Sequence, residues 1–349
     1  MSAPPASSAP SAPPAEVTGA AVALPAGLDA RYRELIDRVE QQLHQATQYN
    51  DPQAQVYARH LLAAGGKRLR PLLTLLAAEF GDPTRAEVLD AAVGVELIHL
   101  ASLYHDDVMD SAAIRRGAAS AHTLWGNHAA ILTGDLLFAR ASLILAGLGA
   151  EAVKIQAQTF ERLCLGQLHE SLGPAAGENR VEFYLQVLRD KTASLIATAA
   201  RYGAMFAGAN PEVVAAVARY GEQLGIAFQL ADDVLDLSAG ADILGKMPGT
   251  DLRERVLTMP VLLLRERVES GAGSPTDAQL LTDLSGDLSD DAVLAAVLAE
   301  LQRSDVLAAT RDLAAQYAQA ARAELASLPP SPAKEALQLL ALAAVNRTA

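Results

Sequence analysis

Apolar side chains recur at three- and four-residue intervals along most of the chain. Residues at that spacing share one face of an α-helix, so the pattern predicts helices. Convincing runs with the two-residue alternation of a half-buried β-strand are absent from the sequence. We predict helices at 28–46, 67–80, 84–110, 127–147, 150–171, 180–207, 211–237, 250–268, 290–301, 304–327 and 333–345.

Several of these segments are apolar around most of the helix, which is typical of central helices packed on all sides. The pattern therefore predicts an all-α fold, a large single-domain helical bundle over residues 28–349. Residues 1–27 are rich in Pro, Ala and Ser, and we predict a disordered tail there. The polar, turn-rich stretch 269–291 is interpreted as a surface connection.

Composition and charge narrow the classes of function. Ala and Leu dominate, and aromatic residues make up only 4% of the chain, which favours helix. The formal net charge of −13 argues against nucleic acid as a partner. Cys164 is the only cysteine, which excludes an internal disulfide and a cysteine-ligated zinc site and agrees with a reducing compartment.

The sequence contains no uninterrupted apolar run near the ~20 residues that cross a bilayer. The best candidate, 129–150, carries Asp135 and Arg140. The first basic residue is Arg31, so the Pro-rich start of the chain lacks the positive charge of a signal peptide. We expect a cytoplasmic protein without a stable membrane anchor.

Two Asp-rich segments close long apolar helical runs, "YHDDVMD" at 104–110 and "FQLADDVLD" at 228–236. Carboxylates one turn apart on a buried helix repel one another, and burying them without a cation costs several kcal/mol each. Mg²⁺ binds carboxylate oxygens and shares its remaining positions with water and phosphate. Two facing clusters would hold several Mg²⁺ ions and a diphosphate, whereas one cluster alone could be a solvated acidic helix end. The six carboxylates are Asp106, Asp107, Asp110, Asp232, Asp233 and Asp236.

Basic residues accompany these clusters. "GGKRLRP" at 65–71 opens a helix, with Lys67 and Arg70 on one face, and helix N-termini favour anions. Arg115 and Arg116 follow the first cluster and could grip phosphate bidentately or merely offset its charge. No GxSxG, HExxH or Walker A motif occurs. Further candidates are Lys191, Thr192 and Lys246.

The ordered set GGKRLRP, DDVMD, RRG, KT, FQLADDVLD and GK resembles the all-trans polyprenyl diphosphate synthases from about residue 30 to the C-terminus. The resemblance implies the isoprenoid synthase fold and a Mg²⁺-dependent prenyl transfer, with isopentenyl diphosphate and an allylic diphosphate as substrates and a homodimer as the assembly. It implies that Asp106, Asp110 and the second Asp cluster hold Mg²⁺, so we take Asp106, Asp110, Asp232 and Lys191 as the catalytic residues. The allylic diphosphate would contact Arg115, Lys191, Thr192, Gln229 and Lys246. Isopentenyl diphosphate would contact Lys67, Arg70, His99 and Arg116.

The chain also departs from that family. Val256 stands where the family often has a Lys, Gly166–Gln167 replaces a common Gly–Glu pair, and no Pro follows RRG. Ala101 and Ser102 lie one turn before Asp106, where bulky aromatic residues stop chain growth in the family. These small residues predict a long all-trans product of about C30 to C50, unless they merely allow close helix packing.

Other functions stay open at this level. A geranylgeranyl diphosphate synthase, or the catalytic subunit of a two-component synthase, would show the same motifs. A terpene cyclase would carry a different second metal motif, and a non-catalytic subunit would lack one Asp cluster or the basic motif. The primer, the exact chain length and the pathway, to a quinone side chain or a carotenoid, do not follow from the sequence.

Overall fold

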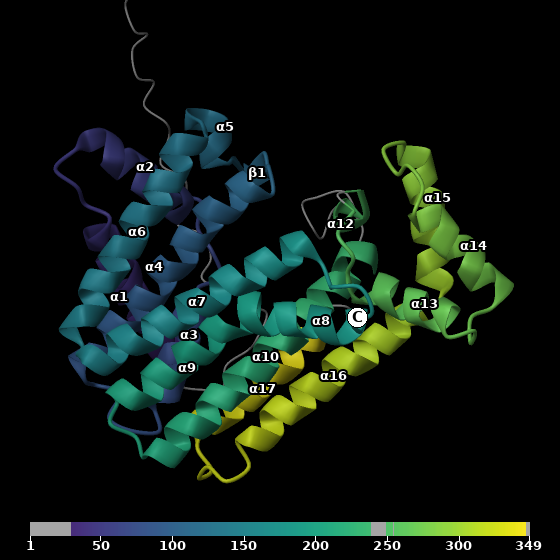
Figure 1. Cartoon of the computed structure of the whole chain (residues 1–349). Helices are drawn as coiled ribbons and strands as arrows, with labels where there is room; N and C mark the ends of the chain where they lie inside the picture. Colours follow the sequence, from purple (N-terminus) through teal and green to yellow (C-terminus); the bar gives the residue numbers. More distant parts are fainter. Residues whose placement is uncertain (1–28, 239–248, 254, 347–349) are drawn as a thin grey trace, which may run out of the picture.

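The computed structural model describes residues 29–238, 249–253 and 255–346. The tail predicted at 1–27 and Lys246 therefore lie outside the described residues. Helices account for nearly all of the described elements (Figure 1). The first helices are α1 (Asp29–Ala46), α2 (Pro52–Ala63), α3 (Leu69–Ala78), α4 (Ala86–Met109), α5 (Ala121–Trp125), α6 (Asn127–Gly147), α7 (Ala150–Leu172), α8 (Arg180–Leu188), a π-helical turn (Arg189–Ala193) and α9 (Ser194–Phe206). They are followed by α10 (Pro211–Ser238), α12 (Thr250–Arg253), α13 (Met259–Glu269), α14 (Pro275–Leu284), α15 (Asp291–Arg303), α16 (Val306–Glu324) and α17 (Pro332–Asn346).

Two long helices, α4 and α10, organise the bundle. Helix α4 packs against α3, α6 and α9, and α10 packs against α9, α16 and α17. Helices α14 and α15 lie on the side of the molecule away from α1 and α2 (Figure 1). The predicted all-α bundle is confirmed. Of the helices that are apolar around most of their surface, α4 is central, whereas α6 leaves large apolar side chains exposed. This arrangement places the C-terminal end of α4, with its Asp residues, beside α6.

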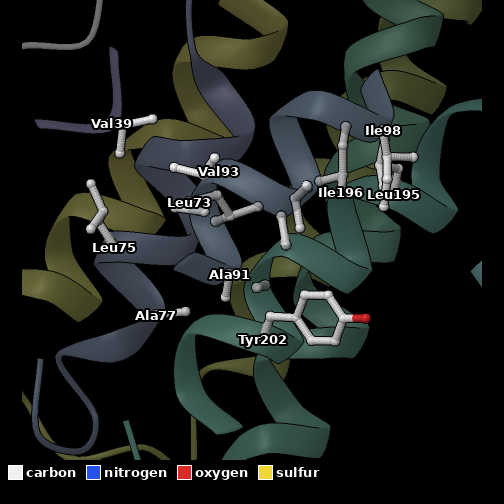
Figure 2. Close-up of a cluster of buried hydrophobic side chains, with 14 of the residues drawn as sticks. Val39, Leu73, Leu75, Ala77, Ala91, Val93, Ile98, Leu195, Ile196 and Tyr202 are labelled. Carbon is white, nitrogen blue, oxygen red and sulfur yellow. The ribbon is translucent and has the colours of Figure 1, made fainter. Parts of the chain in front are cut away.

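The main core joins α1, α3, α4 and α9 through aliphatic side chains (Figure 2). Leu73 and Leu76 of α3 are fully buried, as is Tyr202 of α9. Gly203 brings the two helices into backbone contact, since a Cβ there would lie 2.0 Å from the carbonyl oxygen of Thr74. Close packing by small residues therefore replaces the aromatic side chains that the composition lacks.

The sequence pattern missed the five-residue helix α5 and two longer helices, α2 and α14. Helix α2 begins at the N-cap Asp51, whose side chain accepts hydrogen bonds from the backbone amides of Gln53 and Ala54. Helix α14 lies inside the stretch 269–291, which we interpreted as a connection, and begins with a capping box between Ser274 and Asp277. Both have good capping signals, but their polar composition hides the apolar periodicity.

Two predicted helices are interrupted. The segment 180–207 contains the π-helical turn Arg189–Ala193, and the segment 250–268 divides into α12 and α13. A two-stranded hairpin, β1 (Ile114–Arg115) with β2 (Ala118–Ala119), follows α4. No sequence signal predicts this hairpin, because each strand has only two residues.

Candidate active site

Asp106 and Asp110 lie at the C-terminal end of α4. Burial raises the pKa of Asp106 from 3.8 to about 6, although the nearby Lys191 acts in the opposite direction. Asp110 is the exposed C-cap residue of the helix. Asp106 forms no ion pair within the described part of the chain, so its charge calls for a cation from outside.

Asp107 has a different environment from Asp106. Its side chain is fully buried, and the Arg115 Nε on β1 donates a hydrogen bond to its Oδ1 at 2.6 Å. Burial nevertheless raises the pKa of Asp107, with Arg115 acting against it. Asp107, a predicted metal ligand, and Arg115, a predicted diphosphate contact, therefore form an ion pair with each other.

The second Asp segment repeats this division on α10. Asp233 is buried, and its Oδ2 accepts hydrogen bonds from the Tyr184 hydroxyl at 2.9 Å and from the Met259 backbone amide at 3.2 Å. Burial raises its pKa to about 7. Asp232 and Asp236 are half-buried on the same helix, and Asp236 Oδ2 accepts from the Asp251 amide at 3.4 Å. The middle carboxylate of each cluster is therefore held by protein groups.

The π-helical turn carries Lys191 and Thr192 to a position between the two segments. Lys191 forms an ion pair with Glu170 of α7 and influences the pKa of Asp106. The Thr192 hydroxyl donates to Gln229 Oε1 at 3.3 Å, and Gln229 lies one turn before Asp232 on α10. These contacts connect the predicted allylic-diphosphate residues of the turn with both Asp-rich helices.

The second predicted diphosphate site lies where α3, α4 and the hairpin meet. The Arg116 guanidinium donates to the backbone carbonyls of Leu61 and Gly65, and Gly66 leaves the space that it occupies. Burial lowers the pKa of Arg70 to about 10. Burial and these arginines also hold the pKa of His99 well below its usual range, so His99 is neutral. Lys67 is exposed in the loop 64–68 between α2 and α3.

Arg68 anchors this loop from inside. It has a left-handed backbone conformation, with φ of 46°, which turns its side chain away from the residues on either side. The side chain is buried and binds Glu40 of α1 and Glu96 of α4, at 3.0 Å in the second case. Arg68 thereby fixes the loop to α1 and α4, and the nearby Arg70 Nε is buried without a hydrogen-bond partner among the described residues.

A cavity of about 490 Å³ runs from the charged residues into the bundle between α4, α6 and α7. Asp106 and Lys191 line it, together with Ser102 and Ile98, one and two turns earlier on α4. Phe160 of α7 also lines it and packs on Phe138, with ring centroids 4.0 Å apart. Ala101 is buried in the core and does not line this cavity, because it is rotated by one residue from Ser102.

Within the described residues, no three His, Cys, Asp or Glu side chains come together closely enough to hold a metal ion by themselves. The donor set still fits Mg²⁺, which needs few protein carboxylates and completes its shell with water and phosphate oxygens. The position of Asp106, half-buried and without an ion pair to another described residue, supports this fit.

Sequence reasoning missed several residues at this site. Glu170 of α7 forms an ion pair with Lys191, and Gln167 of the same helix lines the cavity. Gln167 Oε1 is buried without a hydrogen-bond partner among the described residues. Tyr184 holds Asp233 from α8. The Gly166–Gln167 pair was the available signal for α7, whereas nothing in the sequence pointed to Tyr184.

Comparisons with known proteins agree with this geometry. Residues 51–301 match the family model described as polyprenyl synthetase. The chain is 46% identical to nonaprenyl diphosphate synthase of Mycobacterium tuberculosis over 91% of its own length and 94% of the relative. It is 37% identical to heptaprenyl diphosphate synthase component 2 of Geobacillus stearothermophilus, over 90% of this chain and 97% of that one.

A solved structure shows the same architecture. Geranylgeranyl pyrophosphate synthase from Corynebacterium glutamicum, complexed with calcium and isoprenyl diphosphate, superposes with a TM-score of 0.83 at 41% identity. The match covers 94% of this chain and 99% of the other. The chain belongs to the polyprenyl synthetase family and is a prenyltransferase of the trans-polyprenyl diphosphate synthase type.

Proposed function

We propose that this enzyme condenses isopentenyl diphosphate with an allylic diphosphate, in the presence of Mg²⁺, to make a long-chain all-trans polyprenyl diphosphate. The observation that carries the proposal is the cavity between α4, α6 and α7, which has Asp106 and Lys191 at one end and apolar side chains beyond them. A diphosphate with a growing hydrocarbon tail has the same distribution of charge.

The metal ligands are Asp106 and Asp110 of α4 together with Asp232 and Asp236 of α10. Asp107 and Asp233 were also predicted as ligands, but we assign them to orientation, because Arg115 already binds Asp107 Oδ1 and Tyr184 already binds Asp233 Oδ2. Bound Mg²⁺ would neutralise the charge that develops on the departing diphosphate.

Lys191, Thr192 and Gln229 bind the allylic diphosphate, and Arg115 reaches it while fixed by Asp107. Lys246, outside the described residues, keeps the role that the resemblance implies. Lys67, Arg70 and Arg116 bind isopentenyl diphosphate, and neutral His99 supplies a hydrogen bond rather than a charge. Cations around each diphosphate also favour the transition state in which negative charge accumulates.

In the reaction, the allylic C–O bond breaks and diphosphate leaves. The double bond of isopentenyl diphosphate attacks the allylic carbon, a new C–C bond forms, and a proton is lost to the released diphosphate. The product is an allylic diphosphate longer by one unit. The apolar cavity wall of Ile98, Phe160 and Leu163 keeps water from the cationic carbon.

The product grows past Ser102 along the cavity. Ser102 lies about 6 Å from Asp106 along the helix, which is the rise of four helical residues. Its small side chain leaves the passage open there. Ile98 and the Phe138–Phe160 pair form the next barrier. The similarity to a nonaprenyl diphosphate synthase supports a long product. A geranylgeranyl product would require that Ile98 and the Phe138–Phe160 pair close the cavity.

The active enzyme is a homodimer that forms through α6 and α7 and is located in the cytoplasm. Helix α6 is long and apolar enough to cross a membrane by length and composition, yet only 33% of that window is buried. Large apolar side chains on its outer face are exposed, as are others on α7. A second copy would cover this surface, which comprises Leu132, Leu136 and Leu143 of α6 and Leu165, Leu168 and Leu172 of α7.

A second candidate function is the catalytic subunit of a two-component synthase. The 37% identity to heptaprenyl diphosphate synthase component 2 favours it, since that protein is named as one of two components. Diphosphate release by the purified chain tests both candidates. We expect release only with Mg²⁺ and both substrates. Release from the allylic diphosphate alone would indicate cyclisation or hydrolysis, and no release would indicate that a partner chain is required.

A further inference from the structure

The π-helical turn Arg189–Ala193 is held by side chains that do not face the cavity. Arg162 of α7 donates its Nε to Asp190 Oδ1 at 2.7 Å and its Nη2 to the Arg189 carbonyl at 3.1 Å. Gln186 donates to the other Asp190 oxygen at 2.7 Å. The Asp190 side chain is only 10% exposed, so these partners satisfy it almost completely.

Arg162 also ties the turn to α10. Its Nη2 donates to Glu222 Oε1 at 2.8 Å, so one guanidinium joins α7, the π turn and α10. A π turn holds one residue more than the α-helix it interrupts, and such turns persist where tertiary contacts support them. The paired Arg162 and Asp190 provide that support at the residue directly before Lys191.

Two glycines let α7 and α10 approach the backbone of the turn closely. A Cβ on Gly166 of α7 would lie 2.5 Å from the Lys191 amide nitrogen, and one on Gly225 of α10 would lie 2.5 Å from the Ala193 Cα. Neither helix could approach the turn so closely with a side chain at these positions. The backbone of the turn is therefore packed closely against α7 at Lys191 and against α10 at Ala193.

We propose that Arg162 and Gly166 are positioning residues that hold the π turn and thereby aim Lys191 and Thr192 at the allylic diphosphate. If the turn relaxed to a regular α-helix, Lys191 would rotate by about 100°, which is the angle per helical residue. Its ammonium group would then leave the cavity end occupied by Asp106. This inference rests on the proposed function for the roles of Lys191 and Thr192.

The test uses three variants of the full-length enzyme, Arg162→Gln, Arg162→Lys and Gly166→Ala. Two matched controls remove an arginine and a glycine elsewhere. Arg219→Gln breaks an exposed ion pair with Glu324, and Gly147→Ala adds a methyl group where no atom lies within 4 Å. For each protein, kcat and the two KM values are measured separately for the allylic diphosphate and isopentenyl diphosphate. Hydrogen exchange is followed in peptides that cover 186–196.

We expect the KM for the allylic diphosphate to rise about tenfold or more in Arg162→Gln and Gly166→Ala, since small displacements of binding groups have effects of this size. The KM for isopentenyl diphosphate should stay within about twofold, and Arg162→Lys should recover part of the loss. Amides of the turn should exchange faster, and both controls should match the wild type.

Equal increases in both KM values would overturn the inference, because they would show a general structural role. Unchanged exchange in the turn of Arg162→Gln would also overturn it, and this readout does not depend on turnover. A wild-type enzyme that fails to condense the two substrates would instead refute the proposed function, and with it the link from the turn to the allylic diphosphate.

Discussion

Asp106 and Asp107 are adjacent in the sequence, but we propose opposite tasks for them, and isosteric Asn variants separate these tasks. Asp106 is poorly solvated and has no ion pair with a described residue, whereas Asp107 holds Arg115. The rise in the pKa of Asp106 from 3.8 to about 6 corresponds to at most about 3 kcal/mol of destabilisation at neutral pH. Asp106→Asn should therefore increase the free energy of unfolding measured without Mg²⁺.

Mg²⁺ and inorganic diphosphate provide the second readout. A ligand present at one hundred times its Kd stabilises the folded state by about 2.7 kcal/mol. Asp106→Asn should lose most of this stabilisation, whereas Asp107→Asn should retain it. Turnover should fall by about a hundredfold or more in Asp106→Asn, because a proposed metal ligand is lost. It should also fall in Asp107→Asn, because Arg115 loses its anchor there.

The assay is urea unfolding at pH 7 in EDTA and in Mg²⁺ with diphosphate, with Asp135→Asn as the control. Asp135 lines the same cavity but is not among the proposed ligands. Loss of the Mg²⁺ effect in Asp107→Asn to the same extent as in Asp106→Asn would refute the division of roles.

Three further predictions concern product length, pH and assembly. Ser102→Phe should block the cavity one turn below Asp106 and shorten the product, whereas Ser102→Ala should not; an unchanged product in the Phe variant would show that the chain does not pass there. In EDTA, ionisation of Asp106 should make the free energy of unfolding decrease as pH rises from about 4 to about 7, because its pKa is higher in the folded state; this slope should be smaller in Asp106→Asn, and an identical slope would contradict the assignment. Leu143→Arg, at a site 69% exposed in one chain, should produce monomers in sedimentation velocity, and an unaltered dimer would place the interface elsewhere.

The sequence predicted the long helices, because α4 and α6 are apolar around most of the helix and α7 and α10 have apolar residues at helical spacing. It also brought the Asp segments and the basic residues into one hypothesis. It could not decide which Asp of each cluster turns inward, since neighbouring residues on a helix point about 100° apart and the partners Arg115 and Tyr184 come from other elements. For the same reason the sequence did not show that Ser102 lines the cavity whereas Ala101 points into the core. The π turn was beyond prediction, because it depends on Arg162, Gly166 and Gly225, which come together only in the folded chain.

The central claim is that one chain elongates an allylic diphosphate into a long product. The most direct test incubates the purified protein with farnesyl diphosphate, isopentenyl diphosphate and Mg²⁺, and sizes the dephosphorylated products by chromatography. The account predicts a ladder that ends well beyond geranylgeraniol, in the range of about C30 to C50. A sharp stop at geranylgeraniol would contradict the open passage at Ser102, and no elongation would contradict the claim that the chain acts without a second component.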